Sequence, residues 1–186
     1  MISTADFKNG ISIVQDDEVY TLVEFQHVKP GKGGAFVRTK LKQVRTGKVF
    51  EKTFRAGEKM EQAVIDKQMV QFLYAAGDEY VFMDNDTYDQ VSISAEALGD
   101  DAKFLVDNLE VLTISHEGKL LGVELPAAVV AEVVEAEPGV KGDTVSGASK
   151  QVKISSGAVV QVPLFVNQGD KIKVDTRSGS YIERVN

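Results

Sequence analysis

The chain has 186 residues, a formal net charge of −7, and hydrophobic and charged fractions of 43% and 26%, as expected of a soluble globular protein. It has no cysteine, which excludes disulfides and thiolate metal sites, and its two histidines, His27 and His116, lack metal-binding spacing. The first ten residues lack the apolar core of a signal peptide, and no uncharged apolar run approaches the ~18 residues of a membrane-spanning helix. We therefore expect a cytoplasmic monomer without a metal, a cofactor or a membrane partner.

Positive charge is concentrated in the first third of the chain. Residues 1–64 contain 11 basic and 8 acidic residues, whereas residues 65–186 carry a net charge of −10. Within residues 29–59 there are ten lysines and arginines against two glutamates, a local net charge of +8. This division predicts that the basic head of the chain binds a polyanion.

Residues 2–63 have the pattern of short strands separated by turns, and Lys29-Pro30-Gly31-Lys32-Gly33-Gly34, the tip loop, joins two of them. Pro30 fixes φ and cannot donate a hydrogen bond, while the three glycines allow positive φ. Strands are predicted over residues 19–27 and 36–44 on either side of the loop. Taken alone, the loop could equally be an ordinary polar turn, but its basic surroundings favour a hairpin whose tip presents Lys32 to a partner.

The strand after the tip loop has two different faces. With period-two geometry, Val37, Thr39 and Leu41 point to one side, and a basic face forms on the other. A solvated surface is one interpretation of this basic face, and contact with phosphates is the one we favour because other cations are near in sequence. The predicted RNA-backbone residues are Arg38, Lys40, Lys42, Arg45 and Arg55.

The remaining chain predicts two further strand-rich blocks. Residues 56–59 break the pattern of the first block, and strands are then expected over 68–75, 80–84, 90–94, 109–114 and 120–125. Between them, residues 95–106 have helical composition. Residues 127–137 combine helix-favouring residues with two adjacent pairs of valines, which favours a buried strand, and strands over 152–154, 158–166, 171–175 and 181–185 follow. We predict an all-β protein of three small barrels, over residues 1–64, 65–127 and 128–186.

No catalytic constellation is evident. Lys32 precedes a glycine and a strand, so the tip loop does not match a phosphate-binding P-loop, which continues into a helix. A lysine acting as a Schiff-base nucleophile needs desolvation, whereas a glycine-rich tip exposes Lys32. The acidic residues are scattered through turns, where solvated loops explain them, and the chain is not expected to be an enzyme.

Several segments together resemble bacterial translation elongation factor P over the whole chain. In the first block these are residues 25–33, Arg45-Thr46-Gly47 and Thr53-Phe54-Arg55. In the third block they are residues 139–144, residues 157–170 and residues 174–181. The resemblance implies an SH3/KOW-like first barrel and two OB-like barrels in an elongated, tRNA-like arrangement.

The resemblance also implies a function. Members of the family bind both ribosomal subunits between the peptidyl and exit sites and relieve stalling at consecutive prolines by stabilising the peptidyl-tRNA. The residue matching Lys32 reaches toward the peptidyl-transferase centre and in many members is extended by a modifying enzyme. The implied contacts are with rRNA, peptidyl-tRNA and mRNA: an exit-site codon loop of Gly142, Asp143, Thr144 and Gly147, and a third-domain RNA contact of Arg177, Tyr181 and Arg184.

The chain departs from the family pattern at two places beside the codon loop. Many relatives have Lys-Pro-Ala where this chain has Lys150-Gln151-Val152, and threonine in place of Ser149. The sequence is also compatible with two other functions. A generic OB/KOW module for single-stranded RNA would stack bases on exposed aromatics, but Phe36, Phe50 and Phe54 are expected in the core. The other alternative is an enzyme that uses Lys32 as a covalent nucleophile.

Overall fold

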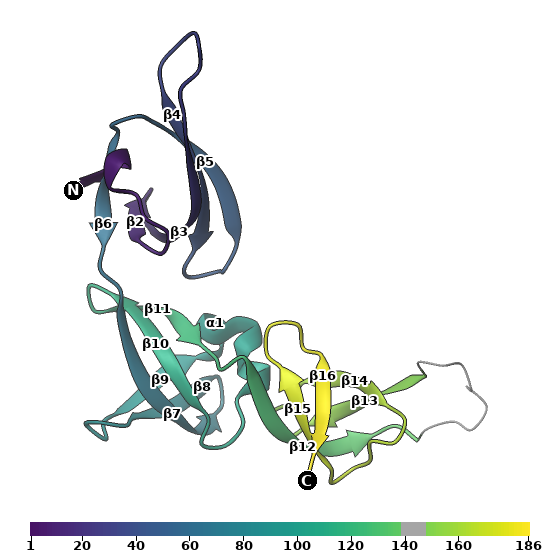
Figure 1. Cartoon of the computed structure of the whole chain (residues 1–186). Coiled ribbons are helices and arrows are strands. Elements are labelled where there is room, and N and C mark those ends of the chain that lie inside the picture. The colour runs from purple at the N-terminus through teal and green to yellow at the C-terminus, as the bar shows by residue number, and fades with distance from the viewer. Residues whose placement is uncertain (139–147) are drawn as a thin grey trace. The chain divides into compact units, whose positions relative to one another are not determined.

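The computed structural model describes residues 1–138 and 148–186, and their strands form three antiparallel sheets (Figure 1). By their internal contacts these residues divide into two compact units. One contains Met1–Lys67 and Ile114–Gly122, and the other contains Gln68–Thr113 and Val123–Asn186. The all-β fold class predicted from the sequence is confirmed.

The first sheet has six strands in the order β1-β6-β2-β3-β4-β5. Their bounds are β1 Ile2–Ser3, β2 Ser12–Gln15, β3 Glu18–Val28, β4 Phe36–Gln43, β5 Val49–Arg55 and β6 Lys59–Ala63. Asp16 and Asp17, with φ of 52° and 63°, form the two-residue turn between β2 and β3, as a type I′ hairpin requires. The long hairpin of β3 and β4 follows, and its loop projects from the sheet (Figure 1).

The core of this sheet follows the predicted alternation of β4. Val37, Thr39 and Leu41 are buried, while the residues between them are exposed. Phe54 of β5 and Phe7 pack into the same core with their rings edge to face, at a centroid distance of 5.7 Å. Burial of these apolar side chains stabilises the barrel that carries the hairpin.

Three expectations for the first block need correction. Within the predicted strand pattern of residues 2–63, Thr4–Asp6 form a short 3-10 helix, η1, because Ser3 and Asp6 form a capping box there. Strand β6 begins at Lys59, where we expected the strand pattern to break. Phe50 is 45% exposed rather than part of the core, and its ring lies edge to face against that of Tyr20 at a centroid distance of 6.3 Å.

The middle sheet has five strands in the order β11-β10-β7-β8-β9. Their bounds are β7 Asp66–Ala76, β8 Glu79–Asp84, β9 Gln90–Ser94, β10 Glu110–His116 and β11 Lys119–Glu124. The helical segment predicted over residues 95–106 is shorter than expected. The α-helix α1 covers only Ala95–Leu98, because Gly99 leaves helical geometry at φ 56° and ψ −134°, and the 3-10 helix η2 (Gly99–Phe104) follows.

The third sheet also has five strands, in the order β14-β13-β12-β15-β16. Their bounds are β12 Ala128–Ala136, β13 Ser149–Ile154, β14 Val159–Pro163, β15 Lys171–Asp175 and β16 Tyr181–Val185. The prediction of a strand for the valine-rich segment is confirmed by β12, in which Val129 and Val133 are buried. Phe104 of η2 is also part of the third sheet's core, so η2 packs against this sheet.

Within the described parts of the chain, no helix is long and apolar enough to span a membrane.

Candidate nucleic-acid interface

The tip loop is a fully exposed cationic element of the first sheet. Strand β3 ends at Val28 and β4 begins at Phe36, and these two residues are paired in register. Every residue of the tip loop is exposed, and a Cβ built on any of its three glycines would meet nothing within 4 Å. Gly33 has a φ of 100°, which side chains rarely adopt. The Lys32 ammonium therefore lies in solvent, on a loop with little steric bulk around it.

The basic face of β4 is present as predicted, but the protein neutralises part of it. Arg38, Lys40 and Lys42 are all exposed. Lys40 forms an ion pair with Glu24 of β3 at 3.2 Å, and its other cross-strand neighbour is Glu51 of β5. Both neighbours are acidic, so the carboxylates of Glu24 and Glu51 supply negative charge beside Lys40, at the centre of the basic face.

The end of the basic face nearest the tip loop is different. Arg38 has the uncharged cross-strand neighbours Gln26 and Thr53, and its guanidinium lies 5.5 Å from the centroid of the Phe36 ring. Arg55 is the cross-strand neighbour of Phe36. Within the described chain, no acidic side chain forms an ion pair with Lys29, Lys32, Arg38 or Arg55. Uncompensated positive charge is thus gathered between Arg38 and the tip.

Arg45 has an intramolecular partner. Its Nη2 donates to Glu18 Oε1 at 2.8 Å, and its Nε donates to Glu18 Oε2 at 3.4 Å. This two-point contact lowers the pKa of Glu18 and raises the pKa of Arg45. Both side chains are partly exposed, so we assign the pair a modest contribution to stability. Arg45 is therefore less available to a phosphate than Arg38 is.

A β-bulge brings Tyr181 and Arg184 to the same side of the third sheet. Residues three apart on a regular strand point to opposite faces. Here the register shifts between Lys173 and Val174, so that Arg184 pairs with Ile172 and Tyr181 pairs with Val174, and both of these partners point into the core. The bulge thus places two of the three residues of the predicted contact on one side of the sheet, which spacing alone does not reveal.

Arg177, the third residue of this predicted contact, lies in the turn between β15 and β16. Asp175 Oδ1 accepts hydrogen bonds from the backbone N–H groups of Ser178, at 3.0 Å, and Arg177, at 2.8 Å. These bonds hold the pKa of Asp175 below its usual value. The ordered turn leaves the Arg177 side chain exposed.

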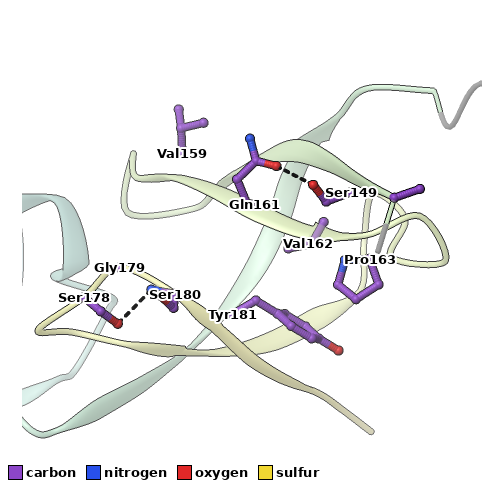
Figure 2. A pocket seen from close by; sticks show the side chains of 10 residues that line it. Ser149, Val159, Gln161, Val162, Pro163, Ser178, Gly179, Ser180 and Tyr181 are labelled. Carbon is purple, nitrogen blue, oxygen red and sulfur yellow. Dashed lines mark hydrogen bonds between the residues drawn. The ribbon is translucent and has the colours of Figure 1, made fainter. Parts of the chain in front are cut away.

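An open groove of about 660 Å³ adjoins Tyr181 (Figure 2). Its walls come from the ends of β13 and β14, the turn before β16, and β16 itself. Ser149 donates a hydrogen bond to Gln161 Oε1 at 2.8 Å across the two strands. Sequence reasoning missed Gln161 and Pro163 as lining residues. The signal that could have found them is the alternation of β14, which turns Val160 and Val162 inward and Gln161 outward.

Two parts of the resemblance concern the neighbourhood of this groove. Gly142, Asp143, Thr144 and Gly147, expected near a codon, lie outside the described residues. The departure at Lys150-Gln151-Val152 falls within β13, where Gln151 pairs with Gln161 and Val152 is buried. The local strand therefore accommodates glutamine and valine in regular pairing.

Within residues 1–138 and 148–186, no group of three or more histidine or acidic side chains is placed to hold a metal ion. His27 packs edge to face on the Phe25 ring, with centroids 5.7 Å apart, and His116 Nδ1 lies 3.1 Å from the carbonyl oxygen of Val64. Both histidines thus have structural contacts.

Comparison with known proteins identifies the family. Models of the KOW-like domain, the OB domain and the C-terminal domain of elongation factor P match residues 3–60, 65–123 and 129–184. The elongation factor P of Pelotomaculum thermopropionicum is 56% identical over 185 residues, and that of Synechocystis sp. is 57% identical over 186 residues, with both proteins and this chain covered in full. A solved structure described as eukaryotic translation initiation factor 5A from Methanococcus jannaschii has a TM-score of 0.51 and 25% identity, covering 64% of this chain and 88% of its own. The chain belongs to the elongation factor P family of translation factors, with a KOW-like domain followed by OB domains.

Proposed function

We propose that this elongation factor binds the ribosome beside the peptidyl-tRNA and stimulates peptide-bond formation, especially between consecutive prolines. The tip loop positions the acceptor end of the tRNA, and Lys32 reaches the peptidyl-transferase centre. The observation that supports this proposal is the uncompensated positive charge at the end of the β3–β4 hairpin. Lys32 lies there in an exposed, glycine-rich loop with open space around its glycines.

The proposed mechanism is positioning rather than acid–base chemistry. Proline reacts slowly because its ring restricts the geometry of attack, so holding the peptidyl-tRNA in a reactive geometry lowers the barrier. Positioning can supply up to ~7–11 kcal/mol in ideal intramolecular reactions. Exposed cations attract phosphates and do not need a shifted pKa to do so. The composition of the tip loop suits that role.

The proposal ranks the five predicted RNA-backbone residues by their partners. Arg38 and Arg55 form no ion pair within the described residues and are the principal phosphate contacts. Lys42 lies at the other end of β4, where it pairs with Val49. Lys40 and Arg45 are paired with Glu24 and Glu18, so they contribute less. A phosphate must displace a carboxylate from either residue before it gains a full charge-assisted contact.

The other proposed contacts involve rRNA and the small subunit. Arg177, Tyr181 and Arg184 contact RNA from the third sheet, and the segment with Gly142, Asp143, Thr144 and Gly147 lies near the exit-site codon of the mRNA. We further propose that the factor acts as a cytoplasmic monomer, with domains over residues 1–64, 65–127 and 128–186. Lys32 is the candidate site for a modifying enzyme: an intact mass of the native protein above the encoded 20.2 kDa, localised to the peptide with Lys32, would show the extension, and an equal mass would argue against it.

The test is translation of a reporter with three consecutive prolines, in cells or extracts that lack the endogenous factor. Lys32→Ala removes the tip ammonium from a loop whose residues are all exposed, so folding should be unchanged and rescue of the reporter should be lost. Lys8→Ala is the matched control, because Lys8 is an exposed lysine of the same sheet unit outside the tip loop. Rescue by Lys32→Ala equal to that of Lys8→Ala would refute the mechanism.

A generic module for single-stranded RNA remains the second candidate, and one observation favours it. Phe50 is exposed beside Tyr20, so an aromatic surface on which a base can stack does exist on the first sheet. This candidate predicts similar affinities for short oligonucleotides and for ribosomes. The proposed translation factor instead binds ribosomes far more tightly, and competition between the two ligands distinguishes the candidates.

A further inference from the structure

Phe165 is an exposed aromatic residue with no role in the core. It follows β14, and its side chain is 54% exposed. Leaving a phenylalanine in water forgoes most of the hydrophobic free energy that its burial would provide. The contact that the ring does make is with a cation, because the guanidinium carbon of Arg184 lies 5.0 Å from the ring centroid.

Arg184 is held from a second direction by Asp170. Arg184 Nη1 lies 3.7 Å from Asp170 Oδ2, and the same oxygen accepts a hydrogen bond from the backbone N–H of Asn167 at 2.8 Å. The carboxylate is therefore fixed by its own turn before it meets the guanidinium. The acidic residue of β16 itself, Glu183, is paired with Lys173 instead, with 3.9 Å between Glu183 Oε1 and Lys173 Nζ.

These contacts leave part of the guanidinium free. The guanidinium carbon lies over the Phe165 ring, Asp170 Oδ2 lies 3.7 Å from Nη1, and the side chain remains 43% exposed. A planar guanidinium presents several N–H donors in a fork that fits two phosphate oxygens. An arginine already held by a ring and a carboxylate loses less side-chain entropy on binding than a freely rotating one.

We propose that Phe165 is a positioning residue, whose ring orients Arg184 so that its free N–H groups meet an RNA phosphate. The inference rests on the proposed RNA contact of the third sheet and extends it to a residue that does not itself touch the phosphate. It also explains why the chain exposes its only phenylalanine beyond residue 104.

The test is a double-mutant cycle on binding of the full chain to ribosomes that carry peptidyl-tRNA. Arg184→Ala should weaken binding about tenfold, as expected for the loss of a hydrogen-bonded charge. It should also lower the slope of log affinity against log salt by roughly 0.7 to 0.9. Phe165→Ala should weaken binding about two- to fivefold, the range of an exposed cation–π contact. The double variant should bind no more weakly than Arg184→Ala alone, because Phe165 acts only through the arginine.

Three further variants separate positioning from a structural role. Phe165→Tyr keeps an aromatic face and should bind like the wild type, whereas Phe165→Leu keeps apolar bulk without a ring and should bind like Phe165→Ala. Val130→Ala, at a 45% exposed position on β12, is the control for trimming an apolar surface residue. It should leave affinity unchanged.

The outcomes distinguish the RNA contact of the third sheet from the positioning role of Phe165. If Arg184→Ala binds like the wild type, the RNA contact of the third sheet is wrong, and the inference falls with it. If Arg184→Ala weakens binding while Phe165→Ala does not, or while the two effects add fully in the double variant, the contact stands and the positioning role is overturned. Wild-type affinity of Phe165→Leu would also overturn the positioning role.

Discussion

At the scale of single residues, the cations of the first sheet differ in their partners more than in their exposure. Arg38 and Lys40 are both exposed on β4, two positions apart. Lys40 has acidic neighbours on both sides, whereas Arg38 has uncharged neighbours and a ring beneath it. A count of basic residues in the sequence treats the two alike, although only one of them has its charge uncompensated.

This difference makes a prediction about ribosome binding. Arg38→Ala should weaken binding about fivefold or more and reduce the salt dependence, because an unpaired phosphate contact is lost. Lys40→Ala should have the smaller effect, because a phosphate must first replace Glu24 at this lysine. Affinities measured over a series of salt concentrations, with Lys8→Ala as the control, compare the two. A larger loss for Lys40→Ala would mean that the pair with Glu24 opens in the complex and that our ranking is wrong.

At the scale of elements, the β3–β4 hairpin could be predicted well from the sequence. Strict alternation at residues 37–42 identifies the buried and exposed faces, because one face of this strand is core and the other is solvent. The glycines and Pro30 identify the loop for an equally local reason. The roles of Lys40 and Arg45 could not be predicted, because their partners Glu24 and Glu18 lie on β3 and meet them only through strand pairing.

Other elements depend on tertiary contacts. Strand β6 has the burial pattern of Met60 and Ala63 inside with two exposed residues between them, which is not period two, so its sequence does not look like a strand. The helical composition of residues 95–106 is interrupted by Gly99. The bulge in β16 that unites Tyr181 with Arg184 reflects the pairing with β15 and leaves no signature in the spacing.

The hydrogen bonds of the β15–β16 turn predict how the stability of the protein depends on pH. Hydrogen bonds from the N–H groups of Ser178 and Arg177 lower the pKa of Asp175 in the folded state, while the unfolded chain has an ordinary value of about 3.9. This stabilisation is complete above the unfolded value and is lost as the pH falls through the folded value, because the unfolded state then binds more protons. Asp175→Asn should therefore lower the free energy of unfolding at pH 7 and have a smaller effect near pH 3.

Urea unfolding of both proteins at the two pH values measures this difference. Asparagine keeps an oxygen acceptor and the size of the side chain, so the variant isolates the charge. A difference between the two proteins that is the same at pH 7 and pH 3, or that grows on acidification, would contradict the assignment.

At the scale of the whole molecule, the core of the third sheet includes a residue from the segment between β9 and β10 of the middle sheet. Phe104 of η2 is 3% exposed and belongs to the third sheet's core, and Ser156 donates a hydrogen bond to the Lys103 carbonyl at 2.6 Å. Gly179 lies against the same ring, since a Cβ at this position would be 3.7 Å from Phe104 Cζ. These contacts explain why residues 68–113 and 123–186 group in one compact unit.

The grouping predicts how the chain unfolds. Phe104→Ala should destabilise the unit that contains it by about 3–5 kcal/mol, the usual cost of removing a buried aromatic side chain. Phe54→Ala, a matched change at a 1% exposed position in the first sheet's core, should lower a different transition. Calorimetry should resolve two transitions, each shifted by one of the variants. A single transition shifted equally by both would show that the units unfold together.

The central claim is that the tip loop lies at the acceptor end of the peptidyl-tRNA, and site-directed cleavage tests it most directly. The chain has no cysteine, so Gly34→Cys provides one attachment point for a tethered iron chelate while Lys32 is kept. The space around Gly34 is open and its φ is not positive, so the loop should tolerate the change. On ribosomes carrying peptidyl-tRNA, we predict hydroxyl-radical cleavage at the acceptor end of the tRNA from position 34, and none there from the control Lys8→Cys. Cleavage confined to other RNA segments, or equal cleavage of the acceptor end from both positions, would contradict the account.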